Sequence, residues 1–187
     1  MRIITGEARG AKLESPANND TRPTLERVKE GIFSAIQFDI PGGRALDLFG
    51  GSGQMGLEAV SRGAVSAVII DNSPAAVSLI KRNAQKCKLM DRCVVLQYDF
   101  KDYLKAAAVS KTQFDLIFLD PPFEKGLVAQ ALELLCENDL IAPNGRVICE
   151  CSEKEMPIIA PEGLELVKTY KYSKTCISIL HKIGAED

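Results

Sequence analysis

The chain has 187 residues, of which 46% are hydrophobic and 26% are charged, and its formal net charge is −2 at a sequence pI near 5.6. This length corresponds to one globular domain, and the average composition excludes disordered, collagen-like and disulfide-rich proteins. Because acidic and basic side chains nearly cancel, the composition also argues against a protein that holds nucleic acid mainly by bulk positive charge.

The first 43 residues are predicted to form an N-terminal extension made of a β-hairpin and a helix. The hairpin is expected to turn near Arg9-Gly10. Apolar residues at helical spacing predict an amphipathic helix from about Thr24 to Phe38. Gly31 interrupts this helix at a cost of about 1 kcal/mol relative to alanine, which indicates that another part of the chain packs against its backbone.

Residues 44–187 are predicted to form one compact unit in which apolar strands alternate with helices. Continuously apolar strands separated by helices are typical of a parallel sheet covered by helices on both faces. The last two strands are joined by a tight turn and predict an antiparallel hairpin at the end of the sheet. We therefore expect a Rossmann-like α/β fold with a mostly parallel sheet of seven strands. The expected strands are 44–49, 65–71, 94–98, 114–119, 146–151, 164–172 and 175–183, and the expected helices are 54–62, a segment opened by Ser73 and Pro74, and 127–138.

Cysteine usage and hydropathy indicate the cellular environment of the protein. The six cysteines contain no C-x-x-C pair and the only histidine, His181, is far from most of them in the sequence, so we expect no metal site. No apolar run approaches the roughly 20 residues of a membrane span, and the first residues lack the core of a signal peptide. We therefore expect a cytoplasmic protein with reduced cysteines and no membrane partner. Cys149 and Cys151 share one face of an expected strand and are interpreted as core residues.

A glycine-rich turn, Gly51-Ser52-Gly53-Gln54-Met55-Gly56, lies between the first expected strand and its helix and matches G-x-G-x-x-G. Such glycines let the backbone approach a ligand, and Asp71, at the end of the next strand, can accept hydrogen bonds from a ribose. Asp47 precedes the turn, where a carboxylate would repel a pyrophosphate but tolerate an ammonium or sulfonium group. Alternatively, Asp47 only accepts hydrogen bonds from loop amides.

The segment Asp120-Pro121-Pro122-Phe123 ends the fourth expected strand, at the sheet edge where open α/β folds bind ligands. Two consecutive prolines cannot continue a sheet ladder, and they fix a carboxylate, a carbonyl and an aromatic ring in one rigid corner. An amino group on a planar base could donate hydrogen bonds to Asp120 and to the Pro121 carbonyl while its ring stacks on Phe123. The alternative is a strand end with a core phenylalanine.

These motifs resemble a known class of enzymes. DLFGGSGQMGLEA (47–59) with LDPPF (119–123) is similar to class I S-adenosylmethionine-dependent methyltransferases that modify exocyclic amino groups. RIITGEARGAKL followed by TRPTLERVKEGIF resembles more narrowly the RsmD family, whose members methylate the N2 amino group of a guanine in small-subunit (16S) ribosomal RNA. The resemblance covers nearly the whole chain. It implies the class I methyltransferase fold, a catalytic core over 44–187 and S-adenosyl-L-methionine as cofactor.

The resemblance also implies roles for individual residues. Asp47 and the glycine loop would hold the methionine part of the cofactor, Asp71 its ribose and Asp99 its adenine, although Asp71 could instead cap the helix at Ser73 and Asp99 the turn at Lys101. Gly50 stands where alanine is more usual, and Asp71 where glutamate is frequent. The implied catalytic residues are Asp120, Pro121, Pro122 and Phe123, and the implied cofactor-binding residues are Asp47, Phe49, Gly50, Gly51, Ser52, Gly53, Asp71, Asn72, Asp99, Phe100, Thr24 and Arg27.

The expected partner is ribosomal RNA or an assembling small ribosomal subunit. The residues before Gly31 contain six basic and five acidic side chains, so even this part of the chain is close to neutral. RNA is therefore expected to be selected by a local pocket and by its shape. In the helix opened by Ser73, three basic residues near its end are interpreted as partners of the helix dipole. These are Lys81, Arg82 and Lys86.

Three other functions share part of these features. A nicotinamide-dependent oxidoreductase would leave Asp47 and the 120–123 corner unexplained. A DNA adenine-N6 methyltransferase would share both motifs but normally carries a target-recognition region for which this length has little room. A non-catalytic RNA-binding or assembly factor would need a basic face, which the overall charge does not indicate.

Overall fold

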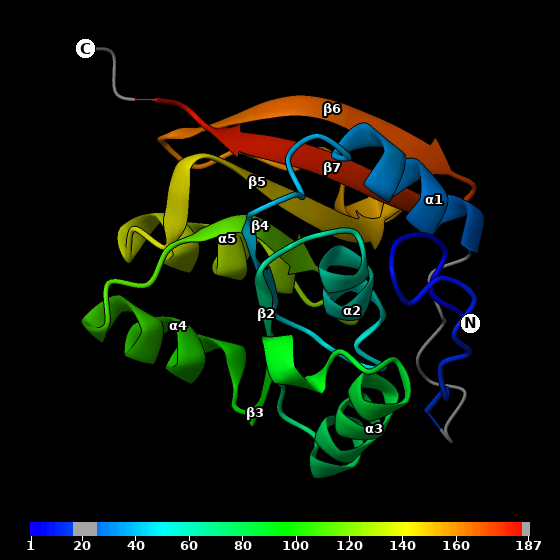
Figure 1. Cartoon of the computed structure of the whole chain (residues 1–187). Helices are drawn as coiled ribbons and strands as arrows, with labels where there is room; N and C mark the ends of the chain where they lie inside the picture. Colours follow the sequence, from blue (N-terminus) through cyan, green and yellow to red (C-terminus); the bar gives the residue numbers. More distant parts are fainter. Residues whose placement is uncertain (17–25, 185–187) are drawn as a thin grey trace.

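Seven strands form one sheet in the computed structural model, which describes residues 1–16 and 26–184 (Figure 1). The strand order is β3-β2-β1-β4-β5-β7-β6, with β1 to β5 parallel and β7 antiparallel to both of its neighbours. The predicted mostly parallel sheet with a terminal hairpin is thus confirmed. The elements are α1 (Glu26–Ala35), β1 (Arg44–Asp47), α2 (Gln54–Ser61), β2 (Ser66–Asp71), α3 (Pro74–Lys86), η1 (Met90–Arg92), β3 (Cys93–Gln97), α4 (Phe100–Val109), β4 (Phe114–Leu119), α5 (Leu127–Glu137), β5 (Ile141–Ser152), η2 (Glu153–Glu155), β6 (Leu164–Tyr172) and β7 (Thr175–Lys182).

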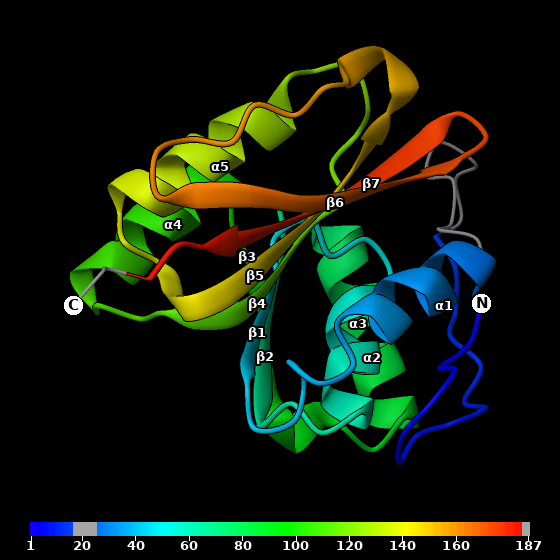
Figure 2. The same cartoon turned by 90° about the horizontal axis from the view of Figure 1, so that it is seen from above.

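Helices cover both faces of the sheet. Figure 2 shows α1, α2 and α3 on one face and α4 and α5 on the other, and each layer has its own hydrophobic cluster. Every residue of α2 is buried, because α2 lies between the sheet and the N-terminal segment 1–16. Cys149 and Cys151 lie in the second cluster, as predicted, and burial raises the pKa of both thiols.

Three predicted elements differ from the structure. The N-terminal hairpin is a single antiparallel bridge between Arg2 and Lys12 with a turn between them. The fifth strand begins at Ile141 and not at residue 146, because its first part pairs with Phe114 across an irregularity in the β4–β5 ladder. Of the predicted helix that was to begin at Thr24, the structure describes the part from Glu26, which ends at Ala35 and so falls short of Phe38.

One helix, α4, was not predicted. Asp99 is its N-cap, and its side chain accepts a hydrogen bond from the Lys101 amide at 2.9 Å. The buried residues of α4 recur at spacings of three and four, which is the sequence signal that could have identified the helix. They are Phe100, Tyr103, Leu104 and Ala107.

Gly31 faces the side chain of Tyr172, so the predicted close approach to the backbone of α1 is confirmed. A Cβ atom at Gly31 would lie 2.2 Å from the Tyr172 hydroxyl oxygen and 3.3 Å from the ring carbon that carries it. This contact explains why a glycine is tolerated inside α1 in spite of its conformational cost.

We expect Gly31→Ala to lower the free energy of unfolding by about 1–3 kcal/mol, because overpacking outweighs the roughly 1 kcal/mol by which alanine favours a helix. Urea denaturation measures the change. The control is Tyr172→Phe, which removes the clashing hydroxyl: in this background Gly31→Ala should be nearly neutral. Equal destabilisation in both backgrounds would show that Tyr172 is not the obstacle.

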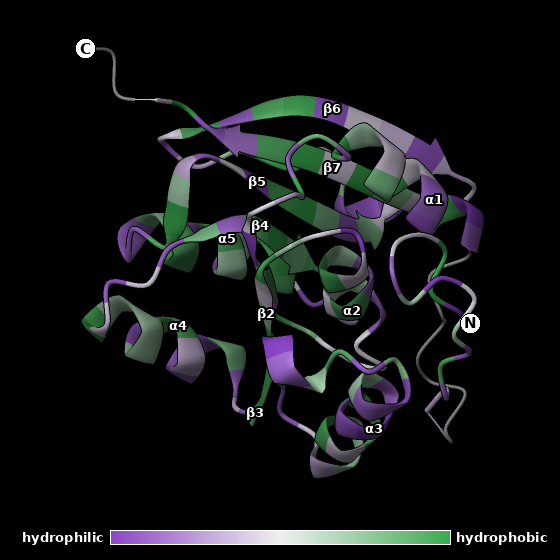
Figure 3. Cartoon of the chain, viewed as in Figure 1, coloured by the Kyte–Doolittle hydropathy of each residue, from purple (hydrophilic) through white to green (hydrophobic). Residues whose placement is uncertain are grey.

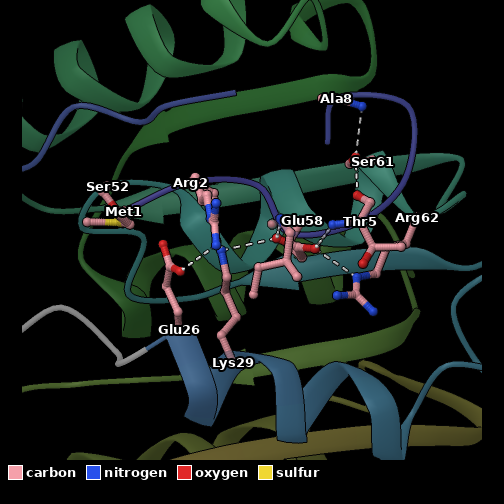
Figure 4. Close-up of polar contacts among 12 residues, drawn as sticks. Met1, Arg2, Thr5, Ala8, Glu26, Lys29, Ser52, Glu58, Ser61 and Arg62 are labelled. Atoms are coloured by element: carbon pink, nitrogen blue, oxygen red, sulfur yellow. Dashed lines mark hydrogen bonds and ion pairs between the residues drawn. The ribbon is translucent and has the colours of Figure 1, made fainter. Parts of the chain in front are cut away.

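The N-terminal segment is attached to α2 by a buried polar cluster (Figure 4). The carboxylate of Glu58 is fully buried and accepts hydrogen bonds from the amides of Ile4 and Thr5 at 2.9 and 3.0 Å. It also forms ion pairs with Lys29 of α1 at 3.1 Å and with Arg62 at 2.8 Å. The Lys29 ammonium, equally buried, donates to the Arg2 carbonyl at 2.6 Å. Glu58 therefore joins the N-terminal segment, α1 and α2.

Candidate active site

Acidic residues gather at the carboxyl ends of four neighbouring strands. Asp47 ends β1 and is in register with Ile69 of β2 and Phe118 of β4. Asp71 and Asp120 follow these two partners by two residues, so both lie just beyond Asp47 at the same edge of the sheet. Asp71 is in turn in register with Gln97 of β3, two residues before Asp99. The parallel sheet therefore brings the predicted acids to one edge, where open α/β folds bind ligands.

The glycine loop is held by its own backbone hydrogen bonds. The Gly50 amide donates to the Ile70 carbonyl at 2.7 Å, and the Gly53 amide donates to the Gly50 carbonyl at 2.6 Å. Gly51 and Gly53 have φ angles of 55° and 78°, in the left-handed region that favours glycine. The space beside Gly51 is open, because a Cβ there would meet only one carbonyl oxygen, at 4.0 Å. A ligand can therefore approach the backbone at Gly51.

Little space is left for a side chain at Gly50, although alanine is more usual at this position in the enzymes that the loop resembles. A Cβ at Gly50 would lie 2.7 Å from Ile69 Cγ2 and 2.8 Å from Ile80 Cδ1. A side chain at position 50 would therefore require Ile69 and Ile80, which pack beneath the loop, to shift.

Asp47 is buried beneath the loop, with 1% of its surface exposed. Its Oδ2 accepts a hydrogen bond from the Gly56 amide in the first turn of α2, at 3.0 Å. The pKa of the Asp47 carboxyl is raised to about 8, mainly by burial and to a smaller extent by the nearby carboxylates of Asp120 and Asp71, while the hydrogen bond from the Gly56 amide lowers it. Asp47 therefore accepts a backbone amide, as the alternative interpretation had it. The surrounding negative charge also favours a cation beside this carboxyl.

Asp71 holds the loop from the other side. Its Oδ2 accepts from the Gly51 amide at 2.9 Å and its Oδ1 from the Ser73 amide at 2.9 Å. Asp71 thus contacts the start of α3, as the alternative interpretation had it, although the N-cap residue is Ser73 itself. The bond to Gly51 shows that the same carboxylate also positions the glycine loop. Each oxygen has a second lone pair, so ribose hydroxyls can still donate to it. The neighbouring Asn72 is exposed.

The buried side chain of Asn83, in α3, was not predicted as part of the site. Its Nδ2 donates to the Ser52 carbonyl at 2.9 Å and to the Glu14 carbonyl at 3.1 Å, while its Oδ1 accepts from the Glu14 amide at 2.8 Å. Ser52 itself is buried, and its hydroxyl contacts the Met1 sulfur at 3.1 Å. Asn83 therefore joins the glycine loop to the N-terminal segment. A polar residue within the apolar face of a helix is the only sequence signal for such a role.

Aromatic rings flank the edge between β1 and β3. The rings of Phe49 and Phe100 lie 5.1 Å apart at an interplanar angle of 47°. Asp99 is exposed beside them and caps α4, as the alternative interpretation had it. An exposed carboxylate next to two rings is compatible with a planar base at this end of the site.

The residue that follows the corner after β4 pairs with η2. Asp120 is half-buried, Pro121 is buried, and Phe123 is partly exposed. The following residue, Glu124, has a φ angle of 61° and pairs with Lys154 of η2 through both carboxylate oxygens, each at 3.0 Å. The corner therefore presents a carboxylate and an aromatic ring at the same edge as Asp47.

Two predicted site residues, Thr24 and Arg27, gain no support from a contact with this edge among the described residues. Thr24 lies outside the described residues. Arg27 lies in the first turn of α1, where it is exposed and forms no hydrogen bond or ion pair with another described residue. Its role stays a prediction.

Residues 1–16 and 26–184 contain neither a candidate metal site nor a candidate membrane span. This part of the chain has no group of three or more His, Cys, Asp or Glu side chains that could hold a metal ion. It also has no helix of the length and apolar character that crossing a membrane requires.

The sheet order, the glycine loop after β1 and the terminal antiparallel hairpin define the class I methyltransferase fold. An RNA methyltransferase from Salinibacter ruber, solved with S-adenosyl-L-homocysteine, shares this fold with a TM-score of 0.64 at 18% identity, over 89% of this chain and 96% of that one.

The chain belongs to the family described as Conserved hypothetical protein 95, which matches residues 1–181. It is 38% identical over 169 residues to Ribosomal RNA small subunit methyltransferase D of Haemophilus influenzae, covering 90% of this chain and 86% of that relative. A solved structure described as "Putative methyltransferase yhhF from Escherichia coli" is 28% identical with a TM-score of 0.87 and covers 99% of each chain. The resemblance to the RsmD family is thereby confirmed.

Proposed function

We propose that this protein transfers a methyl group from S-adenosyl-L-methionine to the N2 amino group of a guanine in small-subunit ribosomal RNA. The observation that carries the proposal is the gathering of Asp47, Asp71 and Asp120 around one open glycine loop. The pKa of Asp47 is raised mainly by burial and additionally by repulsion from the carboxylates of Asp120 and Asp71. A cationic ligand would relieve this repulsion, and a phosphate would aggravate it. Membership of a family whose curated relatives are named ribosomal RNA methyltransferases supports the substrate class.

The residues present fit this cofactor. S-adenosyl-L-methionine, when bound, supplies a methyl group on a sulfonium centre and carries an ammonium group. Asp47 would face the cationic part from beneath the loop, Gly51 leaves room for close approach, and Asp71 can accept from ribose hydroxyls. Asn72, Asp99, Phe49 and Phe100 would border the adenine end.

The corner 120–123 would bind the target base. The lone pair of the guanine amino group is delocalised into the ring, so the group is a poor nucleophile. The Asp120 carboxylate and the Pro121 carbonyl would accept its hydrogens, turn its lone pair outward and stabilise the positive charge that grows on nitrogen. Phe123 would stack on the ring, with Pro122 keeping the corner rigid. The base must first leave its stack to reach this corner.

Transfer of a labelled methyl group tests the function directly. Tritiated cofactor is incubated with naked small-subunit RNA, with small ribosomal subunits and with DNA, and the products are analysed as nucleosides. We expect label in N2-methylguanosine from one of the RNA substrates. Labelled N6-methyladenine in DNA would identify the other class of amino methyltransferase, and no transfer to any substrate would favour a non-catalytic RNA-binding protein.

We expect cofactor binding at pH 7 to release up to about one proton. With a pKa of about 8, roughly nine in ten Asp47 side chains are protonated at this pH, and a cation beside the carboxyl lowers its pKa. Calorimetric titration in two buffers of different ionisation enthalpy measures the release, which should vanish above about pH 9.5. The pKa of Asp47 is higher in the folded protein than in the unfolded chain, so the folded protein binds more protons between about pH 4 and pH 8. The unfolding free energy without cofactor should therefore fall as the pH rises over this range.

Asp47→Asn is the control for this proton release. The amide cannot ionise, so binding should be weaker and the proton release should be smaller by the amount that Asp47 supplies. The protonation of the cofactor's own amino group is common to both titrations and cancels. Equal release from both proteins would contradict a contact between Asp47 and the cofactor's cationic part.

A further inference from the structure

Basic side chains are concentrated in one part of the fold. Residues 73–92, which include α3 and η1, carry five basic side chains and one acidic side chain, a net charge of +4 in a chain whose total is −2. The rest of the chain therefore carries −6, and the near-neutral total conceals a local excess of positive charge. The five basic residues are Lys81, Arg82, Lys86, Lys88 and Arg92.

The first four of these side chains form an exposed surface, here named the α3 basic face (Lys81, Arg82, Lys86 and Lys88). Figure 3 shows hydrophilic residues along α3. Arg82 pairs with Glu14 at 3.0 Å. Within residues 1–16 and 26–184, the other three form no ion pair with a carboxylate. Among the described residues, three of the four positive charges on this face are thus uncompensated.

The structure of α3 does not account for this arrangement. Only Lys86 lies in the last turn, so the helix dipole explains one of the three residues that were interpreted as its partners. Arg82 and Lys86 are four residues apart on a helix, a spacing at which like charges destabilise it. Apart from the ion pair between Arg82 and Glu14, the α3 basic face gains no ion pair within the described residues that would offset this repulsion.

The α3 basic face lies beside the candidate active site. Asn83 follows Arg82 directly and donates to the Ser52 carbonyl of the glycine loop. Along the helix, Lys81 is about 10 Å from Pro74 at the ligand edge, and the remaining basic residues continue away from it. The N-terminal segment extends the same side of the molecule, since Glu14 and Glu7 pair with Arg82 and Arg92. A polyanion bound along α3 could thus reach the glycine-loop edge.

We propose that the α3 basic face binds the phosphate backbone of the substrate RNA and so holds the RNA while the target base enters the corner at Asp120. This inference rests on the proposed function, which supplies RNA as the partner. Uncompensated lysines on an exposed helix are suited to phosphate contacts, which position nucleic acid without reading its sequence. Base selection stays with the active-site corner.

The test compares two triple variants of equal charge. Lys81, Lys86 and Lys88 are changed to glutamine in the first. Lys105, Lys111 and Lys168 are changed in the second. The control lysines are also exposed, but they belong to α4, to the residues that follow it and to β6, on the opposite face or the opposite edge of the sheet from α3. The measurement is the affinity for a transcript of small-subunit ribosomal RNA between 50 and 300 mM salt, with cofactor affinity and melting temperature as checks of folding.

We expect the first variant to bind RNA about 10- to 100-fold more weakly near 150 mM salt, and its slope of log affinity against log salt to be shallower by about 2. The control should resemble the wild type, and both should bind cofactor normally. Equal RNA affinity of wild type and first variant, or an equal loss in both variants, would overturn the proposal. Because binding is measured without turnover, a failure of methyl transfer would refute the proposed function separately.

Discussion

Asp120→Ala is expected to reduce methyl transfer by at least about 10²- to 10³-fold while leaving cofactor affinity nearly unchanged. The carboxylate would stabilise charge that develops on the target nitrogen only during transfer, so its loss should lower the rate and not the binding of the cofactor. Single-turnover transfer from tritiated cofactor and calorimetric titration measure the two quantities. Asp120→Asn keeps one acceptor oxygen but not the charge, so its rate of methyl transfer should lie between those of the wild type and Asp120→Ala.

The matched control for Asp120 lies on the same strand. Asp115 is near the opposite end of β4, where its Oδ2 accepts a hydrogen bond from the Arg44 amide at 2.7 Å. Asp115→Asn also removes one carboxylate from β4, but at the sheet edge away from the glycine loop, and should leave turnover close to that of the wild type. Wild-type turnover in Asp120→Ala would remove Asp120 from the catalytic residues.

The elements that could be predicted are those in which periodicity and end signals agree. β4 was predicted over 114–119, as observed, because a continuous apolar run ends at two prolines. Ser73 was predicted to cap α3, and its hydroxyl accepts from the Ala76 amide at 3.4 Å. The acids of the site were likewise found from their places after strands, since the ends of parallel strands meet at one edge.

The polar groups that depend on distant partners could not be predicted. Lys29 lies on the apolar face of its helix, four residues before Phe33, and Glu58 lies in a helix that is buried on all sides. Each position alone would be unfavourable for a charge, and only the fold shows that the two neutralise one another. Asn83 is a similar case, because its three hydrogen bonds reach segments 31 and 69 residues away in the sequence.

The distribution of charge illustrates a different limit of prediction from the sequence. The total of −2 is correct, but a sum over the chain cannot show that the bases of α3 gather on one exposed surface while the acids concentrate elsewhere. Three of those acids, at positions 47, 71 and 120, surround the glycine loop. The same near-zero total therefore combines an acidic sheet edge suited to a cationic cofactor with a basic helix suited to RNA phosphates.

Glu58→Gln is expected to lower the free energy of unfolding by about 3–5 kcal/mol, a large share of the 5–15 kcal/mol typical of a domain. The amide can still accept one of the backbone hydrogen bonds from Ile4 and Thr5, but the buried Lys29 ammonium loses its counterion. Burial already lowers the pKa of Lys29, and the charge of Glu58 is the main influence that raises it again. Urea denaturation measures the loss.

A second substitution distinguishes the unpaired charge from a simple packing defect. Lys29→Met removes the ammonium and keeps a side chain of similar length, so adding it to Glu58→Gln should recover part of the lost stability, whereas two independent packing defects would add. Glu26→Gln is the surface control: Glu26 pairs with Arg2 at 3.2 Å in an exposed ion pair, and its loss should cost no more than about 1 kcal/mol. Additive losses at positions 29 and 58 would show that the buried pair does not act as a unit in attaching α1 and the N-terminal segment to α2.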